Sequence, residues 1–292
     1  MTKPPSETPD KKRPARNAST AEGDGFALSR EEKDEVEKKR PPRAAVLHEI
    51  IRSSGEEELK RTLSALIWSS LAAGLSMGFS MLARGVLHRH VAGLPGGFLI
   101  ESLGYPLGFL LVILSRQQLF TENIMTAVLP VMTEPDLRNF RRFLRLWSVV
   151  LAGNLVGVAL FAFGLLHLQQ FDAATQKAFV EIGEEMMRNT PWQMFTKGIL
   201  AGWLISMMVW MLAATERSRF IVVVVTTYVI AIGGFTHIIV GAVEAMYLVF
   251  AGKLAFIDCV TQFALPTLAG NIVGGSLIFA LISHAQVRSD GE

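Results

Sequence analysis

The chain has 292 residues, a mean hydropathy of +0.36, and 28 Lys and Arg residues against 26 Asp and Glu residues. Residues 1–60 hold 13 basic and 13 acidic side chains, so residues 61–292 are only about 12% charged, against about 25% in soluble proteins. The larger part is too apolar for a soluble domain, which excludes a soluble enzyme and predicts a membrane protein with several spans. A net charge of +2 gives no nucleic-acid signal, and the lone Cys259 excludes an intrachain disulfide.

Residues 1–60 are predicted to form a polar cytoplasmic tail. The first 30 residues contain no apolar core of a signal peptide, so the tail is expected to stay on the side where the chain is made. Residues 1–28 are rich in Pro, Lys, Ser and Glu and are expected to be disordered. Ser29 and Glu32 form a capping-box pattern, which predicts a short charged helix that stops at Pro41.

A second helix is expected after the proline pair at 41–42. Val46, Leu47, Ile50 and Ile51 fall on one stripe, which is typical of an amphipathic helix at the membrane surface or against the inner face of the protein. A plain linker is the alternative. Residues 54–57 read as a second capping box that leads into the first span.

Apolar stretches of about 20 residues mark candidate membrane spans. Five stretches qualify: residues 62–83, 96–115, 146–167, 194–214 and 261–283. A sixth, 220–250, is too long for one straight span and carries Gly233, Gly234 and His237 near its middle. A polar run, 116–123, interrupts the second span in the same way. We therefore expect an all-α membrane protein with six spans over 61–285, the second and fifth broken, and a cytoplasmic C-terminus at 286–292.

The basic residues of the short loops predict the orientation. Loops 134–145 and 215–219 are rich in arginine, whereas loop 168–192 is dominated by acidic residues. Arg84 and Arg89 are assigned to an outer loop. Both termini are therefore expected on the cytoplasmic side.

The two halves of this region carry matching motifs. Residues 120–122 (Phe-Thr-Glu) resemble residues 235–237 (Phe-Thr-His), and residues 153–157 resemble residues 270–274. With three spans in each half, the second half must be inverted, which gives an inverted repeat of the kind found in transporters and channels. In this alignment Glu122 takes the place of His237.

Broken helices expose backbone groups, which a bilayer tolerates only beside water or inside protein. Gly233 and Gly234 permit a sharp turn, and Asn154 and Asn271 are placed to bond the freed groups. The breaks therefore predict the position of a pathway. The glycine pairs around each asparagine could also serve close helix packing alone.

These motifs resemble the formate/nitrite transporter family over about 60–285. The resemblance rests on residues 119–121, 153–157, 234–237 and 270–275. It implies an aquaporin-like protomer, a homopentamer with one pore in each protomer, and small monovalent anions such as formate or nitrite. The run Leu-Phe-Thr-Glu-Asn and the charged tail look most like the branch of bacterial inner-membrane members typified by YfdC.

The resemblance also implies roles for individual residues. His237 matches the central pore histidine, Thr121 matches the hydroxyl that bonds it, and Leu119 and Phe120 match an apolar constriction. Residues at a second constriction, at the breaks and beside the pore complete the expected site: Tyr105, Phe109, Ile230, Gly233, Gly234, Phe235, Asn154, Asn271, Glu122 and Asn123.

An ionisable group inside a membrane is functional by default. We expect a weak-acid anion to be stabilised near His237, to take up a proton and to cross the constriction as a neutral acid. Glu122 would repel an anion unless it pairs with Arg116, is protonated, or faces a cation pathway. Glu101 is expected to reach the interface and Glu244 to pack toward a neighbour. A cation-permeable channel that uses Glu122 therefore stays open as the alternative.

No nucleotide-binding loop, no His-Glu-x-x-His motif and no Cys/His ligand cluster occurs in the sequence. The sequence therefore predicts no enzyme, no cofactor and no metal. The expected partners are a small ion, membrane lipid and further copies of the chain, with no nucleic acid. An integral structural or receptor protein is the remaining alternative if the pore is closed.

Overall fold

The computed structural model describes residues 1, 29–40, 42–168 and 170–289, and the regular elements of this part of the chain are helices. The chain divides into two compact units, Met1–Pro41 and Pro42–Glu292. The expectation of disorder for residues 2–28, and the last three residues of the predicted C-terminal tail, lie outside the described residues.

The first unit contains α1 (Arg30–Lys39). The backbone N–H of Glu32 donates to Ser29 Oγ at 3.2 Å, and the N–H of Ser29 donates to Glu32 Oε2 at 2.8 Å. This reciprocal pair satisfies donors that a helix start leaves free. The predicted capping box is therefore confirmed.

The second unit begins with α2 (Ala44–Lys60). Leu47 and Ile51 are buried, while Val46 and Ile50 are each 44% exposed. The helix contacts α6, α7, α8, α10 and α15. The helix forms where it was predicted, and only one half of its apolar stripe, Leu47 and Ile51, lies against the protein.

The second predicted capping box is wrong. Ser54 lies inside α2, and its hydroxyl donates to the carbonyl of Ile50 at 2.9 Å. The next helix starts at Leu63 instead and is capped by Thr62, whose Oγ1 accepts from the N–H of Ala65. The serine-acid pattern failed as a start signal because residues 44–60 already form one continuous helix, so no free N–H groups are present there to be capped.

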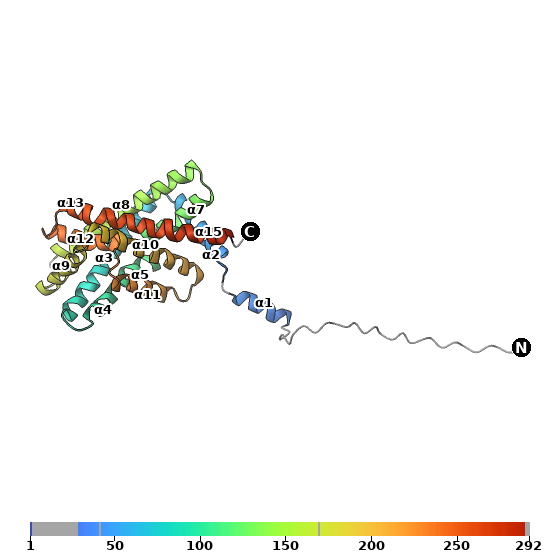
Figure 1. Ribbon diagram of the computed structural model, residues 1–292, viewed down its shortest axis with the longest axis horizontal. Coiled ribbons are helices and arrows are strands. Elements are labelled where there is room, and N and C mark those ends of the chain that lie inside the picture. Colours follow the sequence, from blue (N-terminus) through green and yellow to red (C-terminus); the bar gives the residue numbers. More distant parts are fainter. Residues whose placement is uncertain (2–28, 41, 169, 290–292) are drawn as a thin grey trace. The chain divides into compact units, whose positions relative to one another are not determined.

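Five stretches of helix are long and apolar enough to cross a membrane. They are α3 (Leu63–Val91), Gly97–Leu114, α8 (Leu137–His167), α10 (Pro191–Ala214) and Phe256–Ser289. Gly97–Leu114 contains α4 (Gly97–Glu101), η1 (Ser102–Gly104) and α5 (Pro106–Leu114). Figure 1 shows Phe256–Ser289, in red, as one rod made of α13 (Phe256–Asp258), η2 (Cys259–Ala264), α14 (Leu265–Ile272), η3 (Val273–Ala280) and α15 (Leu281–Ser289).

Shorter helices complete the unit. They are α6 (Phe120–Thr126), α7 (Val128–Thr133), α9 (Ala173–Met187), α11 (Arg219–Ile232) and α12 (Ile238–Phe250). The last two are apolar. Large apolar side chains such as Trp68 and Trp192, 71% and 70% exposed, point outward, as expected of a surface that faces lipid.

Two of the long helices extend beyond their predicted apolar cores. α3 continues to Val91 and α8 already begins at Leu137, because a helix can carry polar residues past the hydrocarbon region that hydropathy detects. The assignment of Arg84 and Arg89 to an outer loop is therefore wrong. Both residues lie on α3.

Close backbone contacts hold two helix pairs together, α3 with α8 and α10 with α14. A Cβ atom added to Gly74 would lie 2.3 Å from the carbonyl oxygen of Asn154, and one added to Gly202 would lie 2.2 Å from that of Asn271. Only glycine permits these approaches. They fix the two asparagines beside the interrupted helices.

Candidate functional site

The first interruption lies between α5, which ends at Leu114, and α6, which begins at Phe120. Asn154 on α8 bonds two backbone groups there and a third on the neighbouring helix α3. Its Oδ1 accepts from the N–H of Phe120 at 2.9 Å, and its Nδ2 donates to the carbonyls of Ser70 and Gln118 at 2.8 and 2.9 Å. A buried, irregular backbone is thereby supplied with hydrogen bonds.

The second interruption lies between α11, which ends at Ile232, and α12, which begins at Ile238. Asn271 on α14 makes the same three contacts. Its Oδ1 accepts from the N–H of Ile238 at 2.9 Å, and its Nδ2 donates to the carbonyls of Gly198 and Thr236 at 2.9 and 3.0 Å.

The backbone conformations pair the two interruptions residue by residue. Arg116 has a φ of 54° and Gly234 a φ of 58°. Three residues further on, Leu119 and His237 are both extended and both precede a helix. The expected equivalence of Glu122 with His237 is therefore wrong. Leu119 is the counterpart of His237, because the shared Phe-Thr letters do not share a backbone position.

His237 is buried and held by two hydrogen bonds. Its Nε2 lies 2.8 Å from Thr121 Oγ1, and its Nδ1 accepts from the N–H of Val240 at 3.3 Å. Because Nδ1 is an acceptor, the network assigns the ring proton to Nε2, which donates to Thr121. The imidazole is therefore neutral in this geometry, and the hydroxyl proton of Thr121 is left for another acceptor.

Aromatic rings lie beside this histidine. The ring of Phe109 contacts that of His237 edge-on at 5.0 Å between centroids, and Tyr105 lies 5.5 Å from Phe109. All three side chains are buried. The expected second group of constriction residues thus lies against the histidine.

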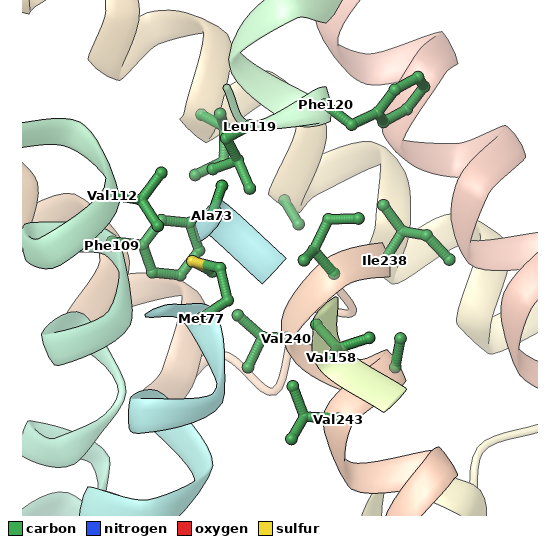
Figure 2. Packing of buried hydrophobic residues seen from close by; sticks show 14 of the residues in the cluster. Ala73, Met77, Phe109, Val112, Leu119, Phe120, Val158, Ile238, Val240 and Val243 are labelled. Atoms are coloured by element: carbon green, nitrogen blue, oxygen red, sulfur yellow. The ribbon is translucent and has the colours of Figure 1, made fainter. Parts of the chain in front are cut away.

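Figure 2 shows Phe109 beside Met77 and Val112, with Leu119 close by, whereas the ring of Phe120 points away from this group. Phe120 packs edge-on against Trp147 of α8 at 5.3 Å. The two expected constriction neighbours, Leu119 and Phe120, are therefore not brought together on one surface.

A cavity of about 380 Å³, here named the α9-side cavity, contains His237 in its wall. Expected residues that also line it are Tyr105, Ile230, Gly234, Phe235 and Glu244. Its cationic lining residues are Arg84, Arg188 and Lys197. Lys197 Nζ donates to the amide oxygen of Asn189 at 2.7 Å, so its charge faces an amide partner rather than a carboxylate.

A second cavity of about 250 Å³, here named the α2-side cavity, shares no lining residue with the first. Its charged lining residues are Glu58, Arg116, Glu122 and Arg219. Asn123, another expected site residue, also lines it and donates to Gln118 Oε1 at 2.9 Å. Gln118 in turn donates to Glu58 of α2 at 2.8 Å.

The expected partners of the buried acids differ from those found. In the described part of the chain Arg116 forms no ion pair with Glu122, although both line the α2-side cavity. Glu101 is only 4% exposed and binds Arg84, so its side chain is paired inside the protein. Glu244 binds Arg84 as well, at 2.8 Å, and lines the α9-side cavity.

Arg84 and His88 are the residues that the sequence reasoning missed. Their spacing of four on an apolar helix places both on one face, which could have marked them as partners of buried acids. Within the described ranges, no group of three or more His, Cys, Asp or Glu residues is arranged to hold a metal ion.

The sequence matches the formate/nitrite transporter family over residues 45–285. Inner membrane protein YfdC of Escherichia coli (strain K12) is 52% identical over 262 residues, covering 89% of this chain and 84% of YfdC. Formate channel BtFdhC of Bacillus thuringiensis is 24% identical over 239 residues, covering 78% of this chain and 89% of the relative.

Solved structures show the same fold. A pentameric formate channel with formate bound matches with a TM-score of 0.69 at 20% identity, covering 78% of this chain and 98% of that one. An ion channel of the same family matches with a TM-score of 0.67 at 20% identity, covering 87% and 99%.

Proposed function

Because the chain belongs to the formate/nitrite transporter family, we propose that it passes small monovalent weak-acid anions, such as formate or nitrite, through a pore in each protomer. Membership and the 52% identity with YfdC confirm the resemblance that the sequence motifs indicated. The formate channel among its relatives supports the choice of anion.

We propose six spans in two inverted repeats. The five long stretches supply five spans, and α11 with α12 supplies the sixth. The second span then consists of Gly97–Leu114 with α6 and α7, interrupted at 115–119, and the fifth is interrupted at 233–237. The matching bonds of Asn154 and Asn271 support the repeat.

We propose that the α2-side cavity opens to the cytoplasm and the α9-side cavity to the outside. Arginines 138, 141, 142 and 145 on α8 lie toward the α2 end, where Arg145 donates to the carbonyls of Leu59 and Arg61. α9, with Glu181, Glu184 and Glu185, lies at the opposite mouth. The bias of basic residues to the cytoplasmic side supports this orientation.

The assembly we propose is a homopentamer in lipid. The fold neighbour described as a pentameric formate channel supports it. Each protomer carries its own pair of cavities, so each would conduct through its own pore rather than through the centre of the ring.

One observation carries the proposal: the Thr121–His237 hydrogen bond lies between the two cavities. His237 lines the α9-side cavity, and the residues directly after Thr121 line the α2-side cavity. This polar pair therefore joins the surroundings of the two cavities, and each of its members lies next to an asparagine-supported break.

The pair offers one hydrogen-bond donor to a passing anion. Because His237 Nε2–H donates to Thr121, the hydroxyl proton of Thr121 is free to bind the anion. An anion held there that takes up a proton from the solvent of the cavity becomes a neutral acid, and His237 and Thr121 keep their own protons. The neutral acid passes Phe109 and Leu119 at far lower cost than an ion, since an uncompensated charge in an apolar constriction is heavily penalised.

The cation-permeable alternative rests on Glu122 and Glu58 in the α2-side cavity. Arg116 and Arg219 line the same cavity and equal them in number. The measurement that separates the alternatives is the reversal potential in a salt gradient. A Glu122→Gln exchange should raise anion flux in an anion channel and abolish current in a cation channel, with exposed Glu216→Gln as the control.

The decisive experiment is flux of formate, nitrite, acetate, sodium and potassium into liposomes across a pH series. We expect the weak-acid anions to pass, and His237→Asn and Thr121→Val each to lower their flux at least about tenfold. Thr133→Val, on α7 away from both cavities, is the matched control. Equal flux in wild type and His237→Asn at every pH would contradict the proposal.

A further inference from the structure

A buried cluster of charged side chains stands behind the α9-side cavity. Arg84 on α3 donates to Glu101 of α4 at 2.9 Å and to Glu244 of α12 at 2.8 Å. The exposed fractions of these three side chains are 13%, 5% and 4%. Arg84 and Glu244 line the cavity, and Glu101 lies directly behind Arg84.

His88, one helical turn after Arg84, faces a carboxylate with each ring nitrogen. Its Nδ1 bonds Glu101 Oε2, and its Nε2 lies 3.1 Å from Glu181 Oε2 of α9. A neutral imidazole has one N–H only, and an ionised carboxylate can only accept. The two contacts together therefore need one extra proton in this group of three side chains.

Further charged side chains on α3 and α9 lie near the cluster. Lys177 of α9 lies 3.4 Å from Glu181, and Arg89 of α3 pairs with Asp172 at 2.8 Å. Each of these two ion pairs has no net charge. The net charge near the cluster therefore changes only with the proton held by His88 and its carboxylates. Glu185 lines the same cavity as Glu244.

The net charge around the α9-side cavity depends on the proton held by the His88 group. Its walls carry three cations, Arg84, Arg188 and Lys197, and two carboxylates, Glu185 and Glu244. The carboxylate of Glu101 behind Arg84 cancels the remaining positive charge. With the proton on the His88 group the vestibule is positive, and without it the vestibule is neutral. A charge inside a narrow, low-dielectric mouth acts strongly on an entering ion.

We propose that Arg84 is a specificity-determining residue of the outer vestibule, and that the proton shared by His88, Glu101 and Glu181 sets how strongly the vestibule attracts anions. Acidification outside would then favour anion entry by adding positive charge at the mouth. This effect acts on affinity and is separate from protonation of the substrate at Thr121 and His237. The inference rests on the proposed anion transport and orientation.

The test uses two substitutions that should act in opposite directions. His88→Gln cannot hold the extra proton, so the KM for formate entering from the α9 side should rise roughly three- to tenfold at acidic pH. Glu101→Gln removes a carboxylate, so KM should fall and stay low at alkaline pH. Both variants should flatten the dependence of KM on outside pH, because each changes the group that shares the proton.

If His88 and Glu101 had only a structural role, both substitutions would change KM in the same direction. Exposed His90→Gln, two residues along α3, is the matched control and should behave as wild type. If Glu101→Gln fails to fold, Glu181→Gln serves instead: it removes a partner of the protonated ring, so the pH midpoint of the KM transition should move to lower pH. A change of KM in one direction for both variants, or none, would overturn the inference.

A second readout does not depend on transport. Histidine labelled with ¹⁵N in the full-length protein should show a signal, lost in His88→Gln, whose titration follows the KM transition and shifts in Glu181→Gln. Absence of anion flux in wild type, with this titration intact, would refute the proposed function and leave the proton site standing. Anion flux that responds to His237→Asn, with no titrating His88 signal, would refute the inference alone.

Discussion

The two interruptions, 115–119 and 233–237, share a backbone and differ in chemistry. In each, the second residue is in the left-handed region and the last is extended, and one asparagine makes three backbone contacts at or beside the interruption. The extended residue is Leu119 in one and His237 in the other. The repeat therefore supplies a frame for irregular backbone, and a single substitution within it supplies the polar group.

The surroundings of the two interruptions differ as well. Gln118 in the first is bonded by Glu58 of α2, whereas its counterpart in the second, Thr236, donates to the carbonyl of Met194. One mouth is thus covered by a helix from before the repeat, and the other is lined by a charge cluster. The asymmetry between the mouths arises from side chains and from α2, while the backbone remains symmetric.

The largest expected effect concerns the asparagines. Asn154→Ala and Asn271→Ala should each lower the stability by about 3 kcal/mol or more, because each leaves one N–H and one carbonyl at a buried interruption without the hydrogen bond of the asparagine. Thermal unfolding in detergent measures the loss, and half-buried Asn139→Ala, whose amide makes one long hydrogen bond of 3.4 Å to the carbonyl of Glu134, serves as the control. If only one of the two variants were destabilised, the structural equivalence of the interruptions would be broken.

Substitutions at the two left-handed residues, Arg116 and Gly234, should change the stability by a smaller amount and in opposite directions. An L-residue in this region costs about 1–2 kcal/mol, and glycine avoids that cost. Arg116→Gly should therefore stabilise the protein by about 1 kcal/mol, and Gly234→Ala should destabilise it by a similar amount. Chemical unfolding of the two variants measures both changes.

A stabilising effect of Arg116→Gly would show that the left-handed backbone at this residue is strained. It would also indicate that the arginine is present for its charge in the α2-side cavity. A loss of stability would show instead that its side chain contributes packing that outweighs the strain. Lowered anion flux in the more stable variant would sharpen the contrast between the cavities.

Local patterns could be predicted from the sequence. The capping box of α1 depends on residues three apart, and the breaks depend on polar residues within an apolar stretch, so both are readable along the chain. The family motif around Asn154 and Asn271 also marked the two residues that bond the interruptions.

Long-range pairings could not be predicted. Arg84 meets Glu244 from a position 160 residues away, and no pattern in either helix specifies the other. The alignment of Glu122 with His237 failed for a related reason. The shared Phe-Thr dipeptide suggested one alignment of the two halves. The asparagine contacts and the left-handed residues define another, and they are the stronger evidence for which residues are equivalent.

The smallest expected effect lies at the α2 mouth, where His48 Nε2 and His284 Nδ1 lie 3.0 Å apart. One ring must donate and the other accept, so protonation of both would break the contact. Burial lowers the pKa of His48 below its ordinary value of about 6.5, and the neighbouring His284 lowers it further.

Because the folded-state pKa is the lower one, the unfolded chain binds this proton more readily. The contribution of His48 to stability is therefore complete above about pH 6.5 and is lost as pH falls toward the folded-state pKa. Between about pH 7 and about pH 5 the unfolding temperature of wild type should fall by about 2 °C more than that of His48→Gln. His90→Gln should follow wild type. Equal slopes would show that α2 is held over the first interruption by Glu58 and its apolar stripe without a contribution from this pair.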